Sequence, residues 1–281
     1  MFPKIDLFHY TSFDAFQGII DNQTIWASSI SLLNDEKEYK YTVDLMKPHL
    51  ENLLQKHKNK ELIEQLSRLI ENSEGGSTYI TSFSEKPDLL SQWRAYCRNG
   101  GCSIGFEKNG IRKIAESIGL SLVKCNYSLT EQKRMVAEFA DELSSKISSK
   151  GDLVKDRNQA LKFHADYVYN QINMLANKIK HPAFEEEQEW RFVKTFVYAN
   201  HPNLKYRAGK GMLIPYFEIS LVSSEEGSNE FPPISEIYIA PHKNSRMSEK
   251  TVRTFLAGER SRRSDSPFVH VKRSDAPYRE I

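Results

Sequence analysis

Two glutamates and an arginine alternate in a segment that runs directly into an apolar, β-forming stretch. In a strand, residues two apart share a face, so Glu187, Glu189 and Arg191 are expected to line one side. Trp190 and Phe192 are expected to line the other. Two carboxylates and a guanidinium are poor core material. The charged face therefore borders either solvent, as in an ordinary edge strand, or a cleft.

Paired carboxylates suit the cleavage of a glycosidic or N-glycosidic bond. Such cleavage builds positive charge on the sugar carbon, which one carboxylate stabilises while a second activates the nucleophile. Glu189 and Glu187 are candidates for these two catalytic roles. Arg191 would keep at least one of them ionised, or would pair with a substrate phosphate.

Other polar and aromatic candidates stand at the ends of predicted strands. Each also has a purely structural reading: His9 as a hydrogen-bonded core residue, Trp26 as core, and Asn34 or Asp35 as a helix cap. No Gly-x-Ser-x-Gly motif is present, and no cysteine has an evident neighbouring base. The candidates are His9, Tyr10, Thr11, Trp26, Asn34, Asp35, Glu38, Ser82 and Ser84.

The composition indicates a folded protein of ordinary charge. The 281 residues are 39% hydrophobic and 27% charged, which allows a substantial core, and the net charge of +2 does not indicate a nucleic-acid coat. No apolar run approaches the roughly 18 residues of a membrane span, and the N-terminus does not resemble a signal peptide. Three sparse cysteines favour free thiols, so we expect a cytoplasmic protein. Neither the cysteines nor the eight histidines show metal-ligand spacing, so we expect no metal site.

The hydrophobic pattern predicts an α+β fold. Short strands do not alternate with long helices, which disfavours a doubly wound parallel sheet. Ser12 can cap a helix from Phe13 to Ile20 whose apolar residues recur at helical spacing, and residues 206–211 are expected to form a loop. Helical insertions are expected at about 36–72, broken at Pro48 or near residues 58–59, and at 129–180, broken near residues 150–152. We expect one domain over residues 1–281. About nine strands are predicted, near residues 5–10, 24–28, 78–84, 102–106, 121–127, 184–198, 212–221, 234–239 and 267–271.

Several short motifs occur in an order that resembles a known family. They are His9-Tyr10-Thr11, Trp26, Asn34-Asp35-x-x-Glu38, Ser82-Phe83-Ser84-Glu85, Trp93-x-x-Tyr96, Gly101-x-Ser103-Ile104-Gly105-Phe106, Glu187-x-Glu189-Trp190-Arg191 and Pro277-Tyr278-Arg279. The order looks like the bacterial family known as domain of unknown function 2971. That family in turn resembles a remote ADP-ribosyltransferase-like fold, a split, mostly antiparallel sheet that clamps NAD in a central cleft.

The resemblance implies roles for the carboxylates and the serines. Ser82 and Ser84 are similar to the serines of the Ser-Thr-Ser strand that supports the NAD pocket of arginine-type transferases. Glu187-x-Glu189 is similar to their Glu-x-Glu, in which the later glutamate holds the ribose 2′-hydroxyl and the earlier one serves the acceptor. His9 stands where those enzymes have arginine, as in the His-Tyr-Glu type, and would bond the adenosine ribose or the NAD backbone.

The resemblance also implies contacts to the rest of NAD. Tyr10 and Trp26 are candidates to stack on nicotinamide or adenine, because a rigid aromatic face binds a flat ring at little entropic cost. Arg94 or Arg191 would meet the pyrophosphate. Thr11 completes the expected NAD-binding set.

Three functional hypotheses follow. The first is an NAD-dependent ADP-ribosyltransferase that modifies a protein or nucleic acid, as in bacterial toxins or anti-phage defence, or that transfers ADP-ribose to water. The second is a catalytically inactive module of the same fold that binds a nucleotide or a partner. The third is a nucleic-acid-directed protein that uses a late basic cluster, whose structural reading is a solvated basic face. The cluster comprises Arg253, Arg260, Arg262, Arg263, Lys272 and Arg273.

Overall fold

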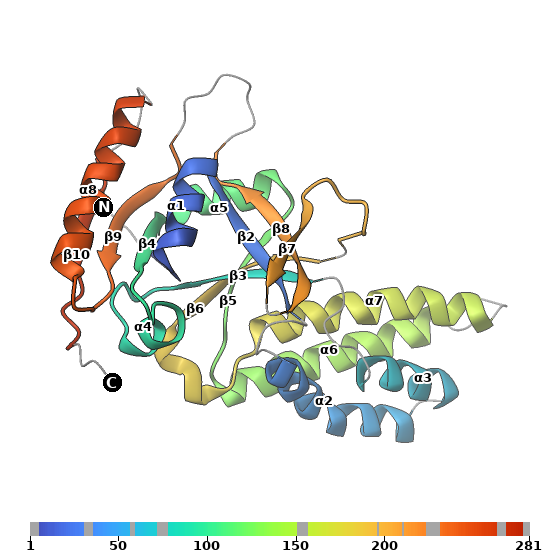
Figure 1. Cartoon of the computed structure of the whole chain (residues 1–281). Helices are drawn as coiled ribbons and strands as arrows, with labels where there is room; N and C mark the ends of the chain where they lie inside the picture. Colours follow the sequence, from blue (N-terminus) through green and yellow to red (C-terminus); the bar gives the residue numbers. More distant parts are fainter. Residues whose placement is uncertain are drawn as a thin grey trace.

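The computed structural model describes residues 6–30, 36–56, 60–71, 78–150, 157–195, 197–209, 211–222, 231–262 and 268–277. Within these residues, ten strands form one large, mostly antiparallel sheet with helices on both faces (Figure 1). The mixed α/β class and the antiparallel sheet confirm the coarse prediction. No described helix combines the length and apolarity that a membrane span needs.

The strands and helices have the following bounds. The strands are β1 (Asp6–Thr11), β2 (Thr24–Ser29), β3 (Tyr79–Ser84), β4 (Cys102–Glu107), β5 (Ser121–Lys124), β6 (Glu189–Lys194), β7 (Leu204–Gly209), β8 (Met212–Ser220), β9 (Ile234–Ile239) and β10 (His270–Arg273). The helices are α1 (Phe13–Asn22), α2 (Glu36–Lys56), α3 (Lys60–Glu71), α4 (Leu90–Tyr96), α5 (Lys108–Ser117), α6 (Leu129–Lys150), α7 (Arg157–Lys178), α8 (Ser245–Arg262) and the 3₁₀ helix η2 (Pro182–Glu187).

Strand β3 is the branch point of the sheet. One edge of β3 pairs along its whole length with β6, which pairs in turn with β5. The other edge is shared, because β2 pairs only with Tyr79 and Ile80 whereas β1 pairs only with Ser84. The order β10-β9-β4-β1-β3-β2-β8-β7 therefore passes through a fork at residues 81–83, where β1 and β2 diverge.

Two side chains hold the fork together in place of a backbone ladder. The Thr81 hydroxyl donates to the carbonyl oxygen of Trp26 at 3.0 Å, which ties β3 to β2. Nδ1 of His9 donates to the carbonyl oxygen of Ser82 at 3.0 Å, which ties β3 to β1. Both contacts satisfy polar groups that the diverging strands leave without ladder partners.

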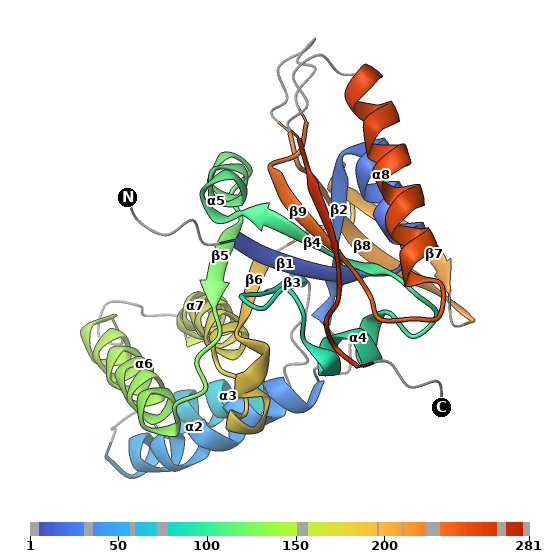
Figure 2. The ribbon, with the colours of Figure 1, turned by 90° about the vertical axis from the view of Figure 1, so that its left-hand side faces the viewer.

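The main core lies on one face of the sheet under α1, α5 and α8 (Figure 2). Helix α1 begins where Ser12 accepts a hydrogen bond from the backbone of Ala15 at 3.3 Å, as an N-cap does. Phe16, Ile19 and Ile20 then recur at helical spacing and are buried against the sheet. This helix and its apolar face follow the prediction.

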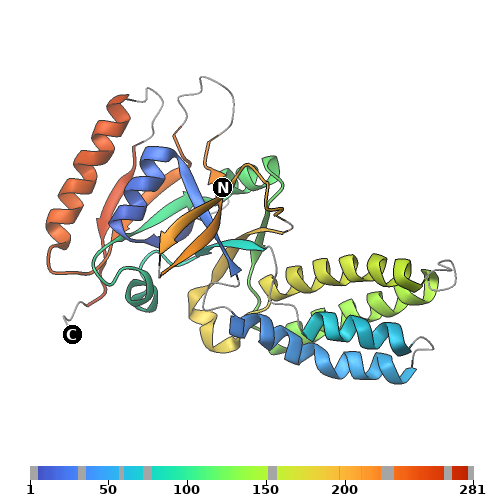
Figure 3. The same ribbon diagram turned by 45° about the vertical axis from the view of Figure 1, so that its right-hand side comes forward.

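A second core lies among α2, α3, α6 and α7, which pack together on the opposite side and extend away from the sheet (Figure 3). These are the two stretches predicted to be helical, at about 36–72 and 129–180. Pro48 does not end α2 but lies exposed inside it. Helix α2 ends at Lys56 and α3 begins at Lys60, which agrees with the alternative prediction of a break near residues 58–59. The two cores meet near β6, where the candidate site lies.

The charged segment before β6 differs from the prediction of one strand over residues 184–198. Pro182 opens a 3₁₀ helix that carries Glu187, and Gln188 then takes a left-handed conformation with φ 45° before β6 begins at Glu189. Proline at the first position and four exposed residues after it favour the helical turn over a strand. A further strand, β7, occupies most of what the sequence suggested was a loop.

Candidate functional site

Five charged side chains form one buried network, here called the ion cluster: Glu38, Lys180, Glu187, Glu189 and Arg191. They come from the first turn of α2, the residue pair after α7, the end of η2, and β6. These four segments are brought together by packing of helices α2, α3, α6 and α7, here called the helical layer, against the sheet.

Glu189 is the centre of the ion cluster and is 5% exposed. Arg191 donates to it through Nε at 2.7 Å and through Nη2 at 3.0 Å, and the Lys180 ammonium also donates to its Oε2. Burial by itself raises the pKa of Glu189, but the two cations outweigh it and lower the pKa to about 2. Glu189 is therefore ionised at neutral pH.

Glu187 binds the same ammonium but has the opposite electrostatics. Its Oε2 lies 2.6 Å from Nζ of Lys180, and its side chain is 19% exposed. Burial raises the pKa of Glu187 and is only partly offset by Lys180. The pair thus contains one carboxylate held as an anion and one biased toward the neutral acid, the arrangement that separates acid and base roles in many enzymes.

Glu38 closes the ion cluster from the helical layer. Its carboxylate lies 2.6 Å from Nη2 of Arg191 and 3.3 Å from Nζ of Lys180. Three carboxylates against two cations leave the cluster with a formal charge of −1. Nη1 of Arg191 is buried without a hydrogen-bond partner in the described residues, so the cluster retains one donor for a further oxygen.

The two predicted serines lie on the same face as the ion cluster. Ser84 is paired across the strands with Glu189, and Ser82 with Arg191, and such pairs share a face. The Ser84 hydroxyl donates to the carbonyl oxygen of Glu187 at 2.6 Å and accepts from the backbone of Lys86 at 3.0 Å. Ser84 therefore positions the end of η2, which carries Glu187.

His9 reaches the fork from the opposite face of the sheet. It is paired with Ile104, and its ring lies 5.9 Å from that of Phe83, both of which belong to the main core. Its Nδ1 bonds the backbone of Ser82 and not a carboxylate. Burial lowers the pKa of His9, which favours the neutral ring. His9 is thus near Ser82 but does not share the face of Glu189.

The side chain of Tyr10 and the backbone carbonyl of Thr11 already make contacts within the protein. The Tyr10 hydroxyl donates to the carbonyl oxygen of Lys86 at 2.7 Å and accepts from the backbone of Leu89 at 2.9 Å, and its ring packs 4.6 Å from Trp93. Thr11 is buried, and its carbonyl oxygen accepts from the Cys97 thiol at 3.3 Å. These contacts leave the Tyr10 ring little surface for stacking on a ligand.

Trp26 is exposed, in contrast to its structural reading as a core residue. It is 42% exposed, stacks on Tyr216 with ring centres 4.3 Å apart, and has the Arg207 guanidinium 5.7 Å from its ring. Ser28, two residues later, pairs with Ile80, so Trp26 shares the sheet face of Ser82. Arg94 is exposed on α4, and no described contact joins its guanidinium to the ion cluster.

The remaining predicted residues that the structure describes do not contribute to the candidate site. All three cysteines are free and buried, and burial raises the pKa of Cys97 and Cys125 to about 12, so neither is an activated nucleophile. In the late basic cluster, four described residues pair with Glu236, Glu249 or Glu259, as a solvated basic face does. Residues Asn34, Asp35, Arg263, Tyr278 and Arg279 lie outside the described residues.

Sequence reasoning missed Lys180, the residue that joins Glu187 to Glu189. It lies in a basic, otherwise unremarkable run after a long helix, and no spacing relates it to the glutamates. Glu38 was part of the Asn-Asp-x-x-Glu motif, but its pairing with Arg191 depends on the docking of α2. Only the tertiary fold brings these groups together.

Comparison with known proteins gives one match. The model of a family of proteins of unknown function, DUF2971, matches residues 92–192, from α4 to β6, a stretch that includes Glu187, Glu189 and Arg191. No curated protein and no solved structure matches the chain significantly. The family suggested by the motif order is therefore confirmed for residues 92–192, which match the DUF2971 model.

Proposed function

We propose that this protein cleaves the nicotinamide–ribose bond of NAD and transfers ADP-ribose to a protein or nucleic acid, or to water. The observation that carries the proposal is the meeting of Glu187 and Glu189 on one ammonium, with their pKa values shifted in opposite directions. An anionic carboxylate is what an oxocarbenium-like sugar needs, and a carboxylate of raised pKa suits proton transfer.

In this proposal the roles divide by charge and position. Glu189 stabilises the developing positive charge and holds the ribose 2′-hydroxyl, whereas Glu187 serves the acceptor. Trp26 stacks on a flat ring of NAD, because it is exposed on the same sheet face as Ser82. His9 and Ser84 act as positioning residues, through the Ser82 backbone and the Glu187 backbone respectively.

Glu38 is the group that substrate must displace. It bonds the outer donor of Arg191 and lies close to Lys180, the two cations that a pyrophosphate would seek. In the proposed complex, phosphate oxygens take the place of the Glu38 carboxylate, and the free Nη1 of Arg191 gains an acceptor. The closed cluster is then the resting state.

The test measures nicotinamide release from NAD by the full chain, with and without a cell extract as the source of acceptor. Glu189→Gln is expected to abolish release, and Glu187→Gln to reduce transfer more than hydrolysis. Glu236→Gln is the matched control, because Glu236 lies on β9, away from the ion cluster, and pairs with Lys272 of β10. Thermal unfolding of each variant separates loss of chemistry from loss of fold. Release that persists in folded Glu189→Gln would contradict the proposal.

A second candidate function is that of an inactive nucleotide-binding module. It is favoured by the hydrogen bonds that the Glu189 carboxylate already accepts within the protein. Both of its oxygens accept from cations and it is nearly buried, as in a purely structural ion network. This candidate predicts NAD binding by calorimetry with no nicotinamide release under any condition. Turnover that requires Glu189 would exclude it.

A further inference from the structure

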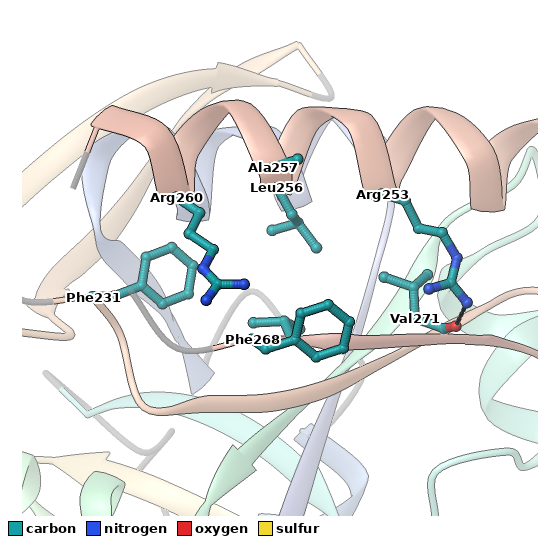
Figure 4. A pocket seen from close by; sticks show the side chains of 8 residues that line it. Phe231, Arg253, Leu256, Ala257, Arg260, Phe268 and Val271 are labelled. Carbon is teal, nitrogen blue, oxygen red and sulfur yellow. Dashed lines mark hydrogen bonds between the residues drawn. The ribbon is translucent and has the colours of Figure 1, made fainter. Parts of the chain in front are cut away.

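A separate cavity lies between α8 and the strand β10 (Figure 4), and α8 lies on the far side of the sheet from the helical layer (Figure 1). Its volume is about 230 Å³. Apolar side chains make up most of its wall, and two arginines enter it from α8. The lining residues are Phe231, Arg253, Leu256, Ala257, Arg260, Phe268, Val269 and Val271.

The two arginines stand seven residues apart on α8, which places them two turns apart on one face. Arg253 is fixed, because it bonds Glu249 at 2.9 Å and also donates to the carbonyl oxygen of Val271. The Glu249 carboxylate is shared with Arg273, whose Nε lies 3.0 Å from it. Arg260 lies with its guanidinium 5.9 Å from the Phe268 ring centre. Within the described ranges, no carboxylate pairs with Arg260. Arg260 is therefore the pocket arginine that has no carboxylate partner among the described residues.

The size of the cavity restricts what it can hold. An apolar cavity of about 150 Å³ accommodates benzene, and pockets for larger ligands span about 300–1,000 Å³. One or two fused rings fit, whereas a dinucleotide does not. The exposed Phe268 and the half-buried Phe231 offer aromatic surface to such a ring, and Figure 4 shows Arg260 directed between them.

We propose that this cavity, the α8 pocket, binds a small aromatic monocarboxylate. The ring occupies the apolar wall, and the carboxylate pairs with the guanidinium of Arg260, which can donate two parallel hydrogen bonds. A dianionic phosphate suits the site less well, because the Arg253 guanidinium is already bonded to Glu249 and to the carbonyl oxygen of Val271, which leaves Arg260 as the arginine available to the ligand. The proposal is independent of NAD cleavage, since the pocket shares no residue with the ion cluster.

The test uses the full chain and three naphthalene probes in isothermal titration calorimetry. 2-Naphthoate is expected to bind at least tenfold more tightly than the neutral 2-naphthamide and more tightly than 2-naphthyl phosphate. Arg260→Gln is expected to weaken 2-naphthoate about tenfold, and Ala257→Trp to abolish binding by filling the pocket. Arg246→Gln removes an exposed arginine of the same helix outside the pocket and is expected to change nothing.

Three results would overturn the proposal. They are equal affinity for the carboxylate and the amide, tighter binding of the phosphate, and 2-naphthoate binding that survives both Arg260→Gln and Ala257→Trp. Both substitutions are at exposed positions of α8, so the variants are expected to fold, and circular dichroism checks this. Absence of any 2-naphthoate binding at millimolar concentration would also overturn it.

Discussion

Glu38 and Arg191 are 153 residues apart in the chain, yet their side chains meet at 2.6 Å. Glu38 belongs to the helical layer and Arg191 to the sheet, so this contact and those of Lys180 join the two cores. Arg191 is only 1% exposed and is among the largest fully buried side chains. A buried guanidinium is tolerated only because carboxylates surround it.

Loss of Arg191 should strongly destabilise the fold. Arg191→Met leaves Glu189 and Glu38 buried with one cation between them, and breaking a buried pair in this way costs about 3–5 kcal/mol. The free energy of unfolding in urea measures the loss. Arg134→Met, which removes an exposed arginine paired along α6, should leave the midpoint unchanged. Similar midpoints for the two variants would show that the ion cluster contributes little.

Acid should weaken the fold through Glu189. Its folded-state pKa of about 2 lies below the ordinary value of 4.5, so its stabilising contribution is present above pH 4.5 and is lost as pH falls toward 2. A shift of this size corresponds to about 3 kcal/mol. Urea unfolding between pH 6 and pH 2.5 measures the decline.

The matched control for the acid experiment is Glu189→Gln, which has no carboxylate to titrate. Its stability should start lower at pH 6 and fall less steeply below pH 4.5. Glu187 acts in the opposite direction, because its raised pKa means that protonation favours the folded state. Parallel pH profiles for the wild type and Glu189→Gln would contradict the assignment.

Removal of the Glu38 carboxylate should favour the binding of NAD, if pyrophosphate takes its place. Glu38→Gln keeps the size of the side chain but removes the negative charge that competes for Arg191 and Lys180. The dissociation constant for NAD, measured by calorimetry, should fall about tenfold, which corresponds to about 1.4 kcal/mol. Weaker binding in a folded variant would show that Glu38 supports the nucleotide site instead.

Substitution of Trp26 should affect ligand binding far more than stability. Trp26 is exposed and packs mainly on Tyr216, so Trp26→Ala should cost only about 1 kcal/mol of unfolding free energy. NAD affinity should fall about tenfold if the ring stacks on a base or on nicotinamide. Tyr206→Ala, at an exposed aromatic residue of β7, is the control and should leave NAD affinity unchanged.

Local patterns predicted much of the fold. The N-cap at Ser12, the apolar spacing of α1, and the strand face shared by Glu189 and Arg191 all depend on neighbouring residues, and the structure has each of them. The start of β6 was misplaced because the acidic run before it forms a 3₁₀ helix after Pro182, and charge alone does not distinguish the two conformations.

What depends on distant packing could not be predicted. Lys180 meets Glu187 and Glu189 because α7 returns the chain to β6, and no sequence spacing reports this return. His9 was expected to lie with the carboxylates, but the pleat of β1 directs it to the main core, where Ile104 is its cross-strand partner. Motif order placed the residues on adjacent strands without fixing which face each would line.

The fork at β3 gives the sheet one place where its shape is adjustable. Along β6 the backbone ladder is continuous, so β3 and β6 move as one rigid ribbon that carries Glu189 and Arg191. Across residues 81–83, hydrogen bonds from the Thr81 and His9 side chains hold β2 and β1 to that ribbon. A change in the angle between β1 and β2 at the fork would break these two side-chain hydrogen bonds and would not require a strand ladder to open.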